Sequence, residues 1–503
     1  MAITTKQYDV CVIGAGAAGL YLTAALAKRR KLRVCLIEAG PKRFRDRRET
    51  VQVTSLRKVH HGVNEARVTA FGGATNTWGG GLVRASPYDF RPLSDQNDTA
   101  WPIPYSEIEP HYASVERVFR IPEMPWASAP IVADYESWRA VLRDVPILPF
   151  RSKNFGRFFG GEIGAAGNID LVCDAGEWSW RLRADTGEPE LVLRAGGRGQ
   201  SCVRARHFVI AAGLVGSVRC VRNLLEQVAP AVAARCGTCF HDHLSFPIAR
   251  LRPASHWKFS ERHSYRFRSG LMWSKHFDLE SVGRTDPGAY LHFTADMSAS
   301  PPLRLLRNLL YSVQNGKYPP FKDCMSDLRE FALAAPRIGV MRYFGKRVLL
   351  DRHTGIFATI DIEQIPGPTN TLQFGGEAGP IAVEWDVTTA DARMAIEHVR
   401  RSKLLLAALL EKDDMSAEWL LPENWEDPSV MGGHLQTVAT DTFHAAGGLR
   451  FGGDVSAVVD RDLNLRAIPR VSVLSTAVFP RVGTSNPTLT LLALADRLEH
   501  RLA

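Results

Sequence analysis

A glycine motif near the start of the chain most strongly constrains the fold. Gly14, Gly16 and Gly19 form a G-x-G-x-x-G between an apolar segment, 8–13, and a segment with helical spacing, 20–28. In this context the glycines let the backbone approach a pyrophosphate, while the helix N-terminus offers amide donors and partial positive charge. The motif predicts a βαβ unit of Rossmann type that binds a dinucleotide.

The second strand of this unit is expected at 33–38, and it ends in a carboxylate. Glu38 lies 19 residues after Gly19. A carboxylate there can accept hydrogen bonds from the adenosine ribose hydroxyls, and it repels a 2′-phosphate. FAD and NAD proteins share this motif, so it does not choose between them.

A second glycine cluster, 71–80, favours a flavin. NAD enzymes rarely need a glycine loop so far beyond the βαβ unit, whereas an isoalloxazine ring must be held rigidly against backbone while its pyrophosphate is bound elsewhere. The alternative is a loop at a tight packing site. The residues expected at the cofactor are Gly73, Thr75, Asn76, Thr77, Trp78 and Gly79.

A chain of 503 residues exceeds what one hydrophobic core usually serves, so we expect two lobes or one large domain with an embedded second one. An apolar segment at 206–212 leads through Gly213, a further candidate cofactor contact, into helical spacing at 217–225. Alternation at 355–365 indicates antiparallel strands. We expect an α/β (α+β overall) protein, with gly-rich loops and a closing helix after Gly432. Its FAD-binding domain would comprise 1–245 and 432–503 with some substrate-side insertions, and its substrate-binding domain 246–431.

The C-terminal segment supplies candidate catalytic groups. The imidazole of His444 suits a base that removes a hydroxyl proton, and the amide of Asn486 can hydrogen-bond the same oxygen. A structural histidine is the alternative for His444. Asn486 before Pro487 also fits a helix N-cap with proline at the first helical position. The helix from Pro487 to about 502, beginning with Thr488, would direct its amide end at the cofactor.

Composition limits the partners. The net charge is +9, and basic residues concentrate between 304 and 347. We interpret this stretch as a solvated face; a patch for an anionic substrate or a membrane surface is the alternative, whereas sparse aromatics disfavour nucleic acid. No leader and no apolar run of roughly 20 residues is present, so we expect a cytoplasmic protein without a transmembrane segment. Cys236 and Cys239 lack the partners of a zinc site, so no metal is expected.

These elements together resemble the glucose-methanol-choline (GMC) oxidoreductase family. The resemblance covers the chain end to end except for much of 250–430. The segment 208–217 looks like an internal signature of the family, and Phe240-His241-Asp242-His243 looks like its Asn-Leu-Gln-Asp-His segment. Trp101-Pro102 and His111-Tyr112 resemble the segment that follows the flavin loop.

The resemblance implies FAD as the cofactor, His444 as the base and Asn486 as its His-or-Asn partner. Some members attach FAD through a histidine at the position of Thr77, so we expect non-covalent FAD here. The chain departs from the family pattern at Gly448 for threonine, at Phe451 for methionine and at Ser475 for aspartate. His434 is a rival imidazole.

The expected reaction is oxidation of a CH–OH group to a carbonyl, with hydride transfer to flavin N5. The loop form and the Asn-Pro-Thr-Leu-Thr ending look like the bacterial, sugar-acting branch near pyranose oxidases. We therefore expect a sugar, glycoside or other small alcohol as substrate, and oxygen or a separate electron acceptor. The alternatives are a redox-neutral or lyase-type flavoenzyme, because a fold does not dictate its chemistry, and a glycan- or membrane-associated flavoprotein.

Overall fold

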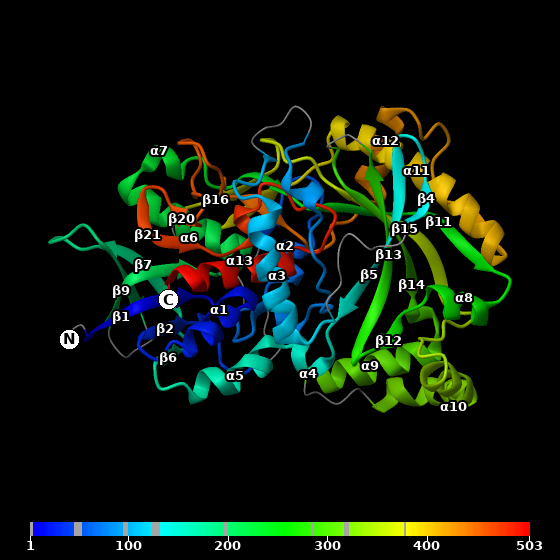
Figure 1. Cartoon of the computed structure of the whole chain (residues 1–503), viewed down its shortest axis with the longest axis horizontal. Helices are drawn as coiled ribbons and strands as arrows, with labels where there is room; N and C mark the ends of the chain where they lie inside the picture. The colour runs from blue at the N-terminus through cyan, green and yellow to red at the C-terminus, as the bar shows by residue number, and fades with distance from the viewer. Residues whose placement is uncertain are drawn as a thin grey trace.

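Two large sheets lie side by side, with helices packed around them (Figure 1). The computed structural model describes residues 4–44, 53–93, 99–122, 131–194, 200–282, 286–315, 321–376 and 379–502. The buried apolar side chains form one continuous core that extends through both sheets. The predicted α/β fold class is confirmed.

The first sheet carries the predicted βαβ unit. Its central strands pair in parallel in the order β21-β9-β1-β2-β6, with β20 at the edge and the β7–β8 hairpin beside β9. Segments far apart in sequence therefore meet in one sheet. The strands are β1 (Thr4–Ile13), β2 (Val34–Ile37), β6 (Ile169–Val172), β7 (Glu177–Leu182), β8 (Pro189–Arg194), β9 (Gln200–Ile210), β20 (Asn464–Leu465) and β21 (Ile468–Val473).

Four helices position this sheet: α1 (Ala17–Ala27), α3 (Tyr105–Phe119), α6 (Gly213–Val228) and α13 (Pro487–Leu502). Helix α13 is buried along most of its length and packs between α1 and α3. Its Asp496 accepts hydrogen bonds from Tyr21 Oη on α1 and from a ring nitrogen of His111 on α3, each at 2.8 Å. The closing helix begins at Pro487, as the sequence predicts.

The second sheet is antiparallel, in the order β18-β11-β15-β14-β13-β5-β4 with β12 beside β13. β15 (Gly355–Glu363) confirms the strand predicted at 355–365. The sheet includes β4 and β5, which come from within 1–245; the domain boundaries stay a prediction. The other strands are β4 (Ile131–Asp134), β5 (Trp138–Ile147), β11 (His243–Pro253), β12 (Arg266–Arg268), β13 (Leu271–Ser281), β14 (Ala289–Asp296) and β18 (Met415–Trp419).

Smaller elements join the two sheets. β10 pairs with β19, β16 pairs with β17, and β17 pairs with β3. The loops expected after Gly432 are wrong in part, because α12 continues beyond that glycine. The elements are β3 (Val53–Ser55), α2 (Gly62–Glu65), α4 (Phe150–Lys153), α5 (Phe155–Ala165), α7 (Pro230–Ala233), β10 (Thr238–His241), α8 (His256–His263), α9 (Pro301–Asn315), α10 (Phe321–Tyr343), β16 (Thr371–Phe374), β17 (Ile381–Glu384), α11 (Thr389–Asp413), α12 (Pro428–Val438) and β19 (Ala446–Gly448). Within the described ranges, no helix has both the length and the apolarity needed to cross a membrane.

Candidate active site

The three motif glycines lie between β1 and α1, where two of them meet backbone. A Cβ on Gly14, whose φ is +106°, would lie 2.5 Å from Ala211 O, and a Cβ on Gly19 would lie 2.0 Å from Gly14 O. A Cβ on Gly16, in contrast, would have no atom within 4 Å. The first two glycines therefore allow close packing, and Gly16 borders open space at the helix N-terminus where a pyrophosphate fits.

Glu38 ends β2 beside this turn and is buried. Its two carboxylate oxygens accept hydrogen bonds from the backbone N–H groups of Ala15 and Gly40, each at 2.9 Å. Burial raises the pKa of Glu38, although these two hydrogen bonds oppose the shift. The carboxylate thus also holds the glycine turn in shape, a role that the sequence did not indicate.

The second glycine loop contacts the first. Gly72 N–H donates to Ala15 O at 2.9 Å, and a Cβ on Gly73 would lie 2.8 Å from the Cα of Gly16. The structure therefore brings the two loops predicted to hold the cofactor together. Gly213, the third expected contact, begins α6 with a φ of +69°, and a Cβ there would meet no atom within 4 Å.

Most polar side chains of the second loop have partners inside the protein. Thr75 Oγ1 donates to Gly72 O at 2.6 Å, Asn76 Nδ2 donates to Gly73 O at 2.9 Å, and Trp78 Nε1 donates to Lys153 O at 2.6 Å. Thr77 Oγ1 makes only a long bond, 3.4 Å, to Ala74 O. These bonds rigidify the loop, so its backbone is the part that remains available to a flat ring.

A cavity of about 790 Å³ lies between this loop and the antiparallel sheet. Seven predicted site residues border it: Thr75, Thr77, Trp78, Gly79, His444, Asn486 and Thr488. The other predicted residues lie outside its lining, at the glycine turns, the end of β2 and the start of α13. The cavity thus brings together residues that are more than 350 positions apart in the sequence.

His444 lies in the loop before β19, and hydrogen bonds fix its ring. Nδ1 lies 2.9 Å from Thr442 Oγ1 and 3.3 Å from His243 Nδ1. Its backbone N–H donates to both oxygens of Asp242 at 3.1 and 3.2 Å. The side of the ring that carries Nδ1 is therefore engaged by protein, which leaves Nε2 for the cavity.

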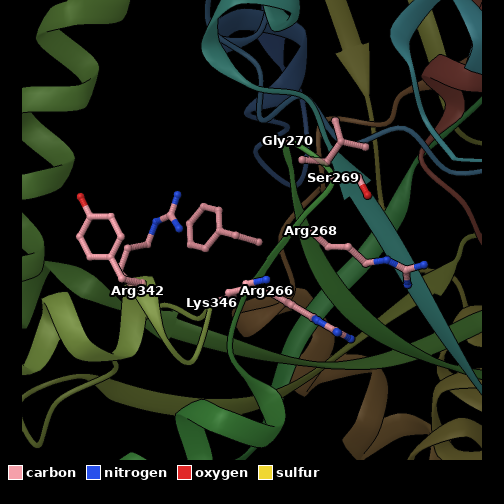
Figure 2. A pocket seen from close by; sticks show the side chains of 9 residues that line it. Arg266, Arg268, Ser269, Gly270, Arg342 and Lys346 are labelled. Carbon is pink, nitrogen blue, oxygen red and sulfur yellow. The ribbon is translucent and has the colours of Figure 1, made fainter.

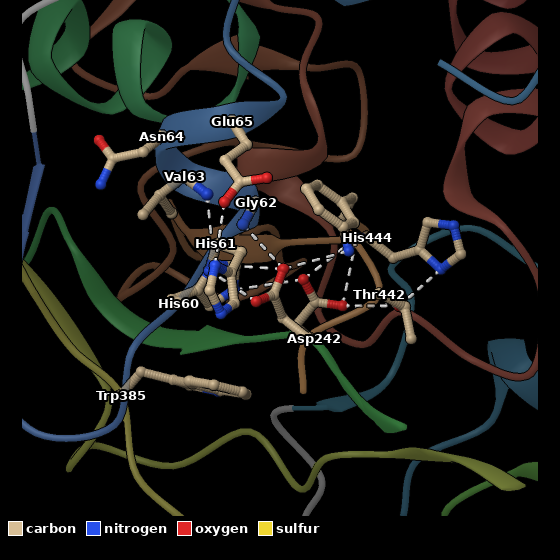
Figure 3. A network of polar contacts seen from close by, with 12 residues as sticks. His60, His61, Gly62, Val63, Asn64, Glu65, Asp242, Trp385, Thr442 and His444 are labelled. Carbon is tan, nitrogen blue, oxygen red and sulfur yellow. Dashed lines mark hydrogen bonds and ion pairs between the residues drawn. The ribbon is translucent and has the colours of Figure 1, made fainter. Parts of the chain in front are cut away.

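Asp242 is the centre of a buried network behind His444 (Figure 3). It accepts hydrogen bonds from Thr442 Oγ1 at 3.0 Å, and His60 Nε2 lies 3.2 Å from its second oxygen. Although burial raises the pKa of Asp242, the contact with His60 and the neighbouring imidazoles hold it below its ordinary value. Asp242 is therefore a carboxylate that accepts from the loop carrying His444.

These contacts assign the tautomer of His444. His243 Nε2 lies 2.7 Å from Gly483 O, which can only accept, so Nε2 carries the proton and Nδ1 of that ring accepts. The Thr442 hydroxyl donates to the Asp242 carboxylate, so its oxygen also accepts. Both acceptors face His444 Nδ1, which must then carry the proton. The lone pair of His444 lies on Nε2.

The ring of His444 is neutral over the physiological pH range. Burial lowers its pKa to about 4, and the neighbouring His243 adds to that shift, whereas Asp242 and Asp361 oppose it. A neutral imidazole with a fixed lone pair can accept a proton from a hydroxyl in the cavity.

Asn486 precedes α13 and presents an unpaired acceptor. Its Oδ1 is buried and has no hydrogen-bond partner among the described residues. It therefore does not accept from the N-terminal amides of α13, so the expected side-chain N-cap is wrong, although Pro487 does begin the helix. A buried acceptor at a cavity wall is suited to a bound donor.

The opposite wall of the cavity was missed by the sequence analysis. Tyr290 Oη donates to Asp361 Oδ2 at 2.5 Å, and His292 Nε2 lies 3.4 Å from the other oxygen. His276 stacks on Tyr290 with ring centroids 4.3 Å apart. Burial raises the pKa of Asp361, but the His292 contact and hydrogen bonds hold it well below its ordinary value. Asp361 lies in the alternating segment 355–365, which predicts a strand but does not identify its side chains as cavity lining.

Two further predictions concern His434 as a rival base and the absence of a metal ion. His434 lies on α12 beside Phe246, outside the cavity lining. The donor atoms of Asp242, His243 and His444 lie within 4.8 Å of one another, which would suit a metal ion. These atoms instead have hydrogen-bond partners in Thr442 and Gly483. The absence of a metal stays a prediction.

Known proteins match this chain in two ways. Residues 375–495 match the family model "GMC oxidoreductase", and residues 9–56 match "Lycopene cyclase protein". No curated protein matches the chain in sequence.

Solved structures share the fold over the whole chain. Pyridoxine 4-oxidase from Mesorbium loti is 15% identical with a TM-score of 0.59, and the match covers 98% of both chains. A formate oxidase of Aspergillus oryzae RIB40 is 13% identical with a TM-score of 0.59, covering 100% and 99%. A fungal aryl-alcohol oxidase is 12% identical with a TM-score of 0.58, covering 98% of both chains.

The fold combines a Rossmann-type sheet with an antiparallel sheet, and the cavity lies beside the second glycine loop. Residues 375–495 match the GMC oxidoreductase family model, and the chain shares its fold with the solved oxidases named above. The resemblance deduced from the motifs is thereby confirmed for 375–495, and FAD is the cofactor that this resemblance implies. Non-covalent attachment stays a prediction.

Proposed function

We propose that this protein oxidises a CH–OH group to a carbonyl, with His444 as the catalytic base. The observation that carries the proposal is the fixed, neutral imidazole of His444, whose Nε2 remains available at a cavity bordered by the second glycine loop. When bound, FAD supplies the acceptor, flavin N5, for the hydride that leaves the alcohol carbon.

The residues that would hold FAD are those of the two loops. Gly16 offers open space and helix-terminal amides to the pyrophosphate, and Glu38 lies where the ribose is expected. The backbone from 73 to 79, with Gly213 and the start of α13 at Pro487 and Thr488, would surround the rest. We propose non-covalent binding, because Thr77 stands where an attaching histidine would be required.

Proton removal is assigned to His444 and orientation to Asn486. The substrate hydroxyl would donate to His444 Nε2, which takes its proton while the carbon loses hydride. As the imidazole becomes positively charged, its Nδ1–H remains bonded to Thr442, and the Asp242 carboxylate stabilises that charge. Because the only proton of that hydroxyl goes to His444, the Asn486 amide would hold the same substrate oxygen by donating from Nδ2.

We propose a sugar or glycoside as the substrate. A polyhydroxylated ring requires several donors and acceptors, and the wall opposite the loop supplies the Asp361 carboxylate together with Tyr290 and His292. Ser245 and Ser274 add hydroxyls to the same lining. Oxygen or a separate acceptor would then reoxidise the cofactor. We further expect the protein to be cytoplasmic.

Anaerobic flavin absorbance tests this function. Purified protein is mixed with sugars, glycosides and simple alcohols one at a time, and loss of the oxidised flavin band reports oxidation. With a substrate in hand, His444→Ala should reduce the rate of flavin reduction by about 10²- to 10⁴-fold while FAD stays bound.

His434→Ala is the matched control, because it removes an imidazole outside the cavity and should leave the rate unchanged. A near-normal rate in His444→Ala would disprove the assignment of the base. Turnover of a substrate with no change in flavin absorbance would favour a redox-neutral reaction.

A further inference from the structure

Helices α9 and α10 form an insertion with an exposed apolar face. The insertion connects β14 to β15 and lies at the end of the molecule far from the N-terminus (Figure 1). Leu333, Val340 and Phe344 follow helical spacing on its outer surface, and their exposed fractions are 68%, 47% and 83%. Tyr343 beside them is 78% exposed. Exposed aromatic groups of this size are unusual on a surface that only meets water.

A basic pocket adjoins the C-terminal end of α10. It has a volume of about 540 Å³, and Figure 2 shows the basic residues around it. Among the described residues that line it, four side chains are cationic and none is acidic. The lining is Arg266, Phe267, Arg268, Ser269, Gly270, Leu271, Arg342, Tyr343 and Lys346.

These cations are not neutralised by the protein. Across the described part of the chain, no acidic group forms an ion pair with Arg266, Arg268 or Arg342. The Arg342 guanidinium stacks on the Phe267 ring, 3.7 Å from its centroid, which leaves its N–H groups for an external acceptor. Arg304 on α9, in contrast, pairs with Asp327 through a 2.8 Å bond. The positive charge therefore concentrates at one end of the insertion.

The positive charge of the pocket also lowers the pKa of two neighbouring cations, Arg347 and Lys275. Burial lowers the pKa of Arg347 and repulsion from Arg266 lowers it further, whereas Asp144 opposes the shift. Burial likewise lowers the pKa of Lys275, with Arg347 and Arg266 adding to the shift. An anion in the pocket would relieve this repulsion.

We propose that this face, the exposed side of α10 with the basic pocket, docks on an anionic phospholipid bilayer. Tyr343 and Phe344 would enter the interface, and the pocket cations would contact lipid phosphates. A surface that combines exposed apolar groups with Lys and Arg binds anionic lipid through both buried area and charge. The proposal does not depend on the reaction.

A bilayer fits this face better than a second copy of the chain. A symmetric dimer through the same face would place each basic pocket close to another basic pocket, since an isologous interface pairs a patch with itself. Like charges would then oppose association. A lipid surface carries the opposite charge instead.

The experiment is sedimentation of the full-length holoprotein with vesicles. One set contains phosphatidylcholine alone, and the other contains phosphatidylcholine mixed with phosphatidylglycerol. We expect binding to the mixed vesicles only, weakened by salt. Arg342→Gln with Lys346→Gln should weaken it by about 25-fold, since each cation near the surface contributes roughly fivefold. Tyr343→Ser with Phe344→Ser should weaken it by at least tenfold.

Matched controls remove equivalent groups elsewhere. Arg30→Gln with Lys31→Gln removes two exposed cations, and Leu56→Ser with Val455→Ser removes two exposed apolar groups. Both should bind vesicles normally, and flavin absorbance should be unchanged in all four variants. Equal binding to both vesicle types, no binding to either, or equal losses in the controls would overturn the proposal. A dimer that Tyr343→Ser with Phe344→Ser dissociates would assign the face to a second copy.

Discussion

Two regions of the molecule depend on different physical properties. One is the glycine turn at the parallel sheet, and the other is the hydrogen-bond network around His444 at the cavity. At the turns, the essential property is backbone shape: Gly14 and Gly19 are required because other backbone occupies the place of their side chains. At the cavity, the essential property is a chain of hydrogen bonds that sets which nitrogen of His444 carries a proton. The backbone shape of the turn is encoded by nearby residues, whereas the position of the proton on His444 depends on residues from several segments.

Substitutions in these two regions should therefore impair the protein in different ways. A change at the turns should remove the cofactor together with activity, because the cofactor is held by close backbone approach. A change in the network should leave the cofactor bound and slow the reaction.

Gly19→Ala should disrupt the nucleotide sheet and abolish FAD binding. A Cβ would lie 2.0 Å from Gly14 O, so β1 and α1 must move apart. Overpacking of this kind costs about 1–3 kcal/mol or more. Thermal unfolding and flavin content of the purified protein measure the two effects.

Gly16→Ala provides the matched comparison, because its Cβ meets no atom within 4 Å. We expect the apoprotein to unfold at a normal temperature, but FAD to bind weakly since the methyl group occupies the space proposed for the pyrophosphate. If Gly16→Ala retains full flavin, the pyrophosphate lies elsewhere. If Gly19→Ala retains both flavin and stability, close packing at this turn is not required.

Low pH should inactivate the network before it releases the cofactor. His444 acts as a base only when neutral, and its pKa is lowered to about 4. The rate of flavin reduction should therefore be level from neutral pH to about 5 and fall by about tenfold per pH unit below about 4. Rapid-mixing measurements with bound flavin test this. A midpoint near the ordinary histidine value of about 6.5 would contradict the buried, neutral ring.

The sequence predicts well those elements whose determinants lie close together along the chain. The strand–turn–helix around Gly14, the strand at 355–363 and the start of α13 at Pro487 all follow from nearby residues. Glu38 was expected at the ribose, yet the structure also has it bonded to backbone N–H groups. Propensity and spacing specify such elements because their determinants lie within one or two turns of chain.

The cavity could be predicted only in part. His444 and Asn486 were found from chemistry and resemblance, whereas Asp242 was named only as part of a family segment, and its contact with His60 was not foreseen. Asp242 reaches His444 because β10 pairs with β19 and Ser245 pairs with Thr440, contacts about 200 residues apart. No local pattern encodes such a pairing. The Asp361 wall was missed for the same reason.

Thr442 gives the smallest expected effect, because its hydroxyl orients His444 and does not itself take the substrate proton. Its hydroxyl donates to Asp242 at 3.0 Å, and its oxygen accepts from His444 Nδ1 at 2.9 Å. Thr442→Val keeps the shape of the side chain but removes both bonds. A hydrogen bond of this kind contributes about 0.5–1.5 kcal/mol, so flavin reduction should slow by roughly 3- to 10-fold with FAD content unchanged.

Thr442→Ser should restore the rate, because serine retains the hydroxyl that orders His444. This rescue distinguishes a positioning role from a packing role, since serine lacks the methyl group that valine keeps. If Thr442→Ser is as slow as Thr442→Val, the methyl contact matters and the hydroxyl does not. If both variants react at the normal rate, His243 alone is sufficient to hold the proton on His444 Nδ1, and the network behind the cavity has one more bond than the reaction requires.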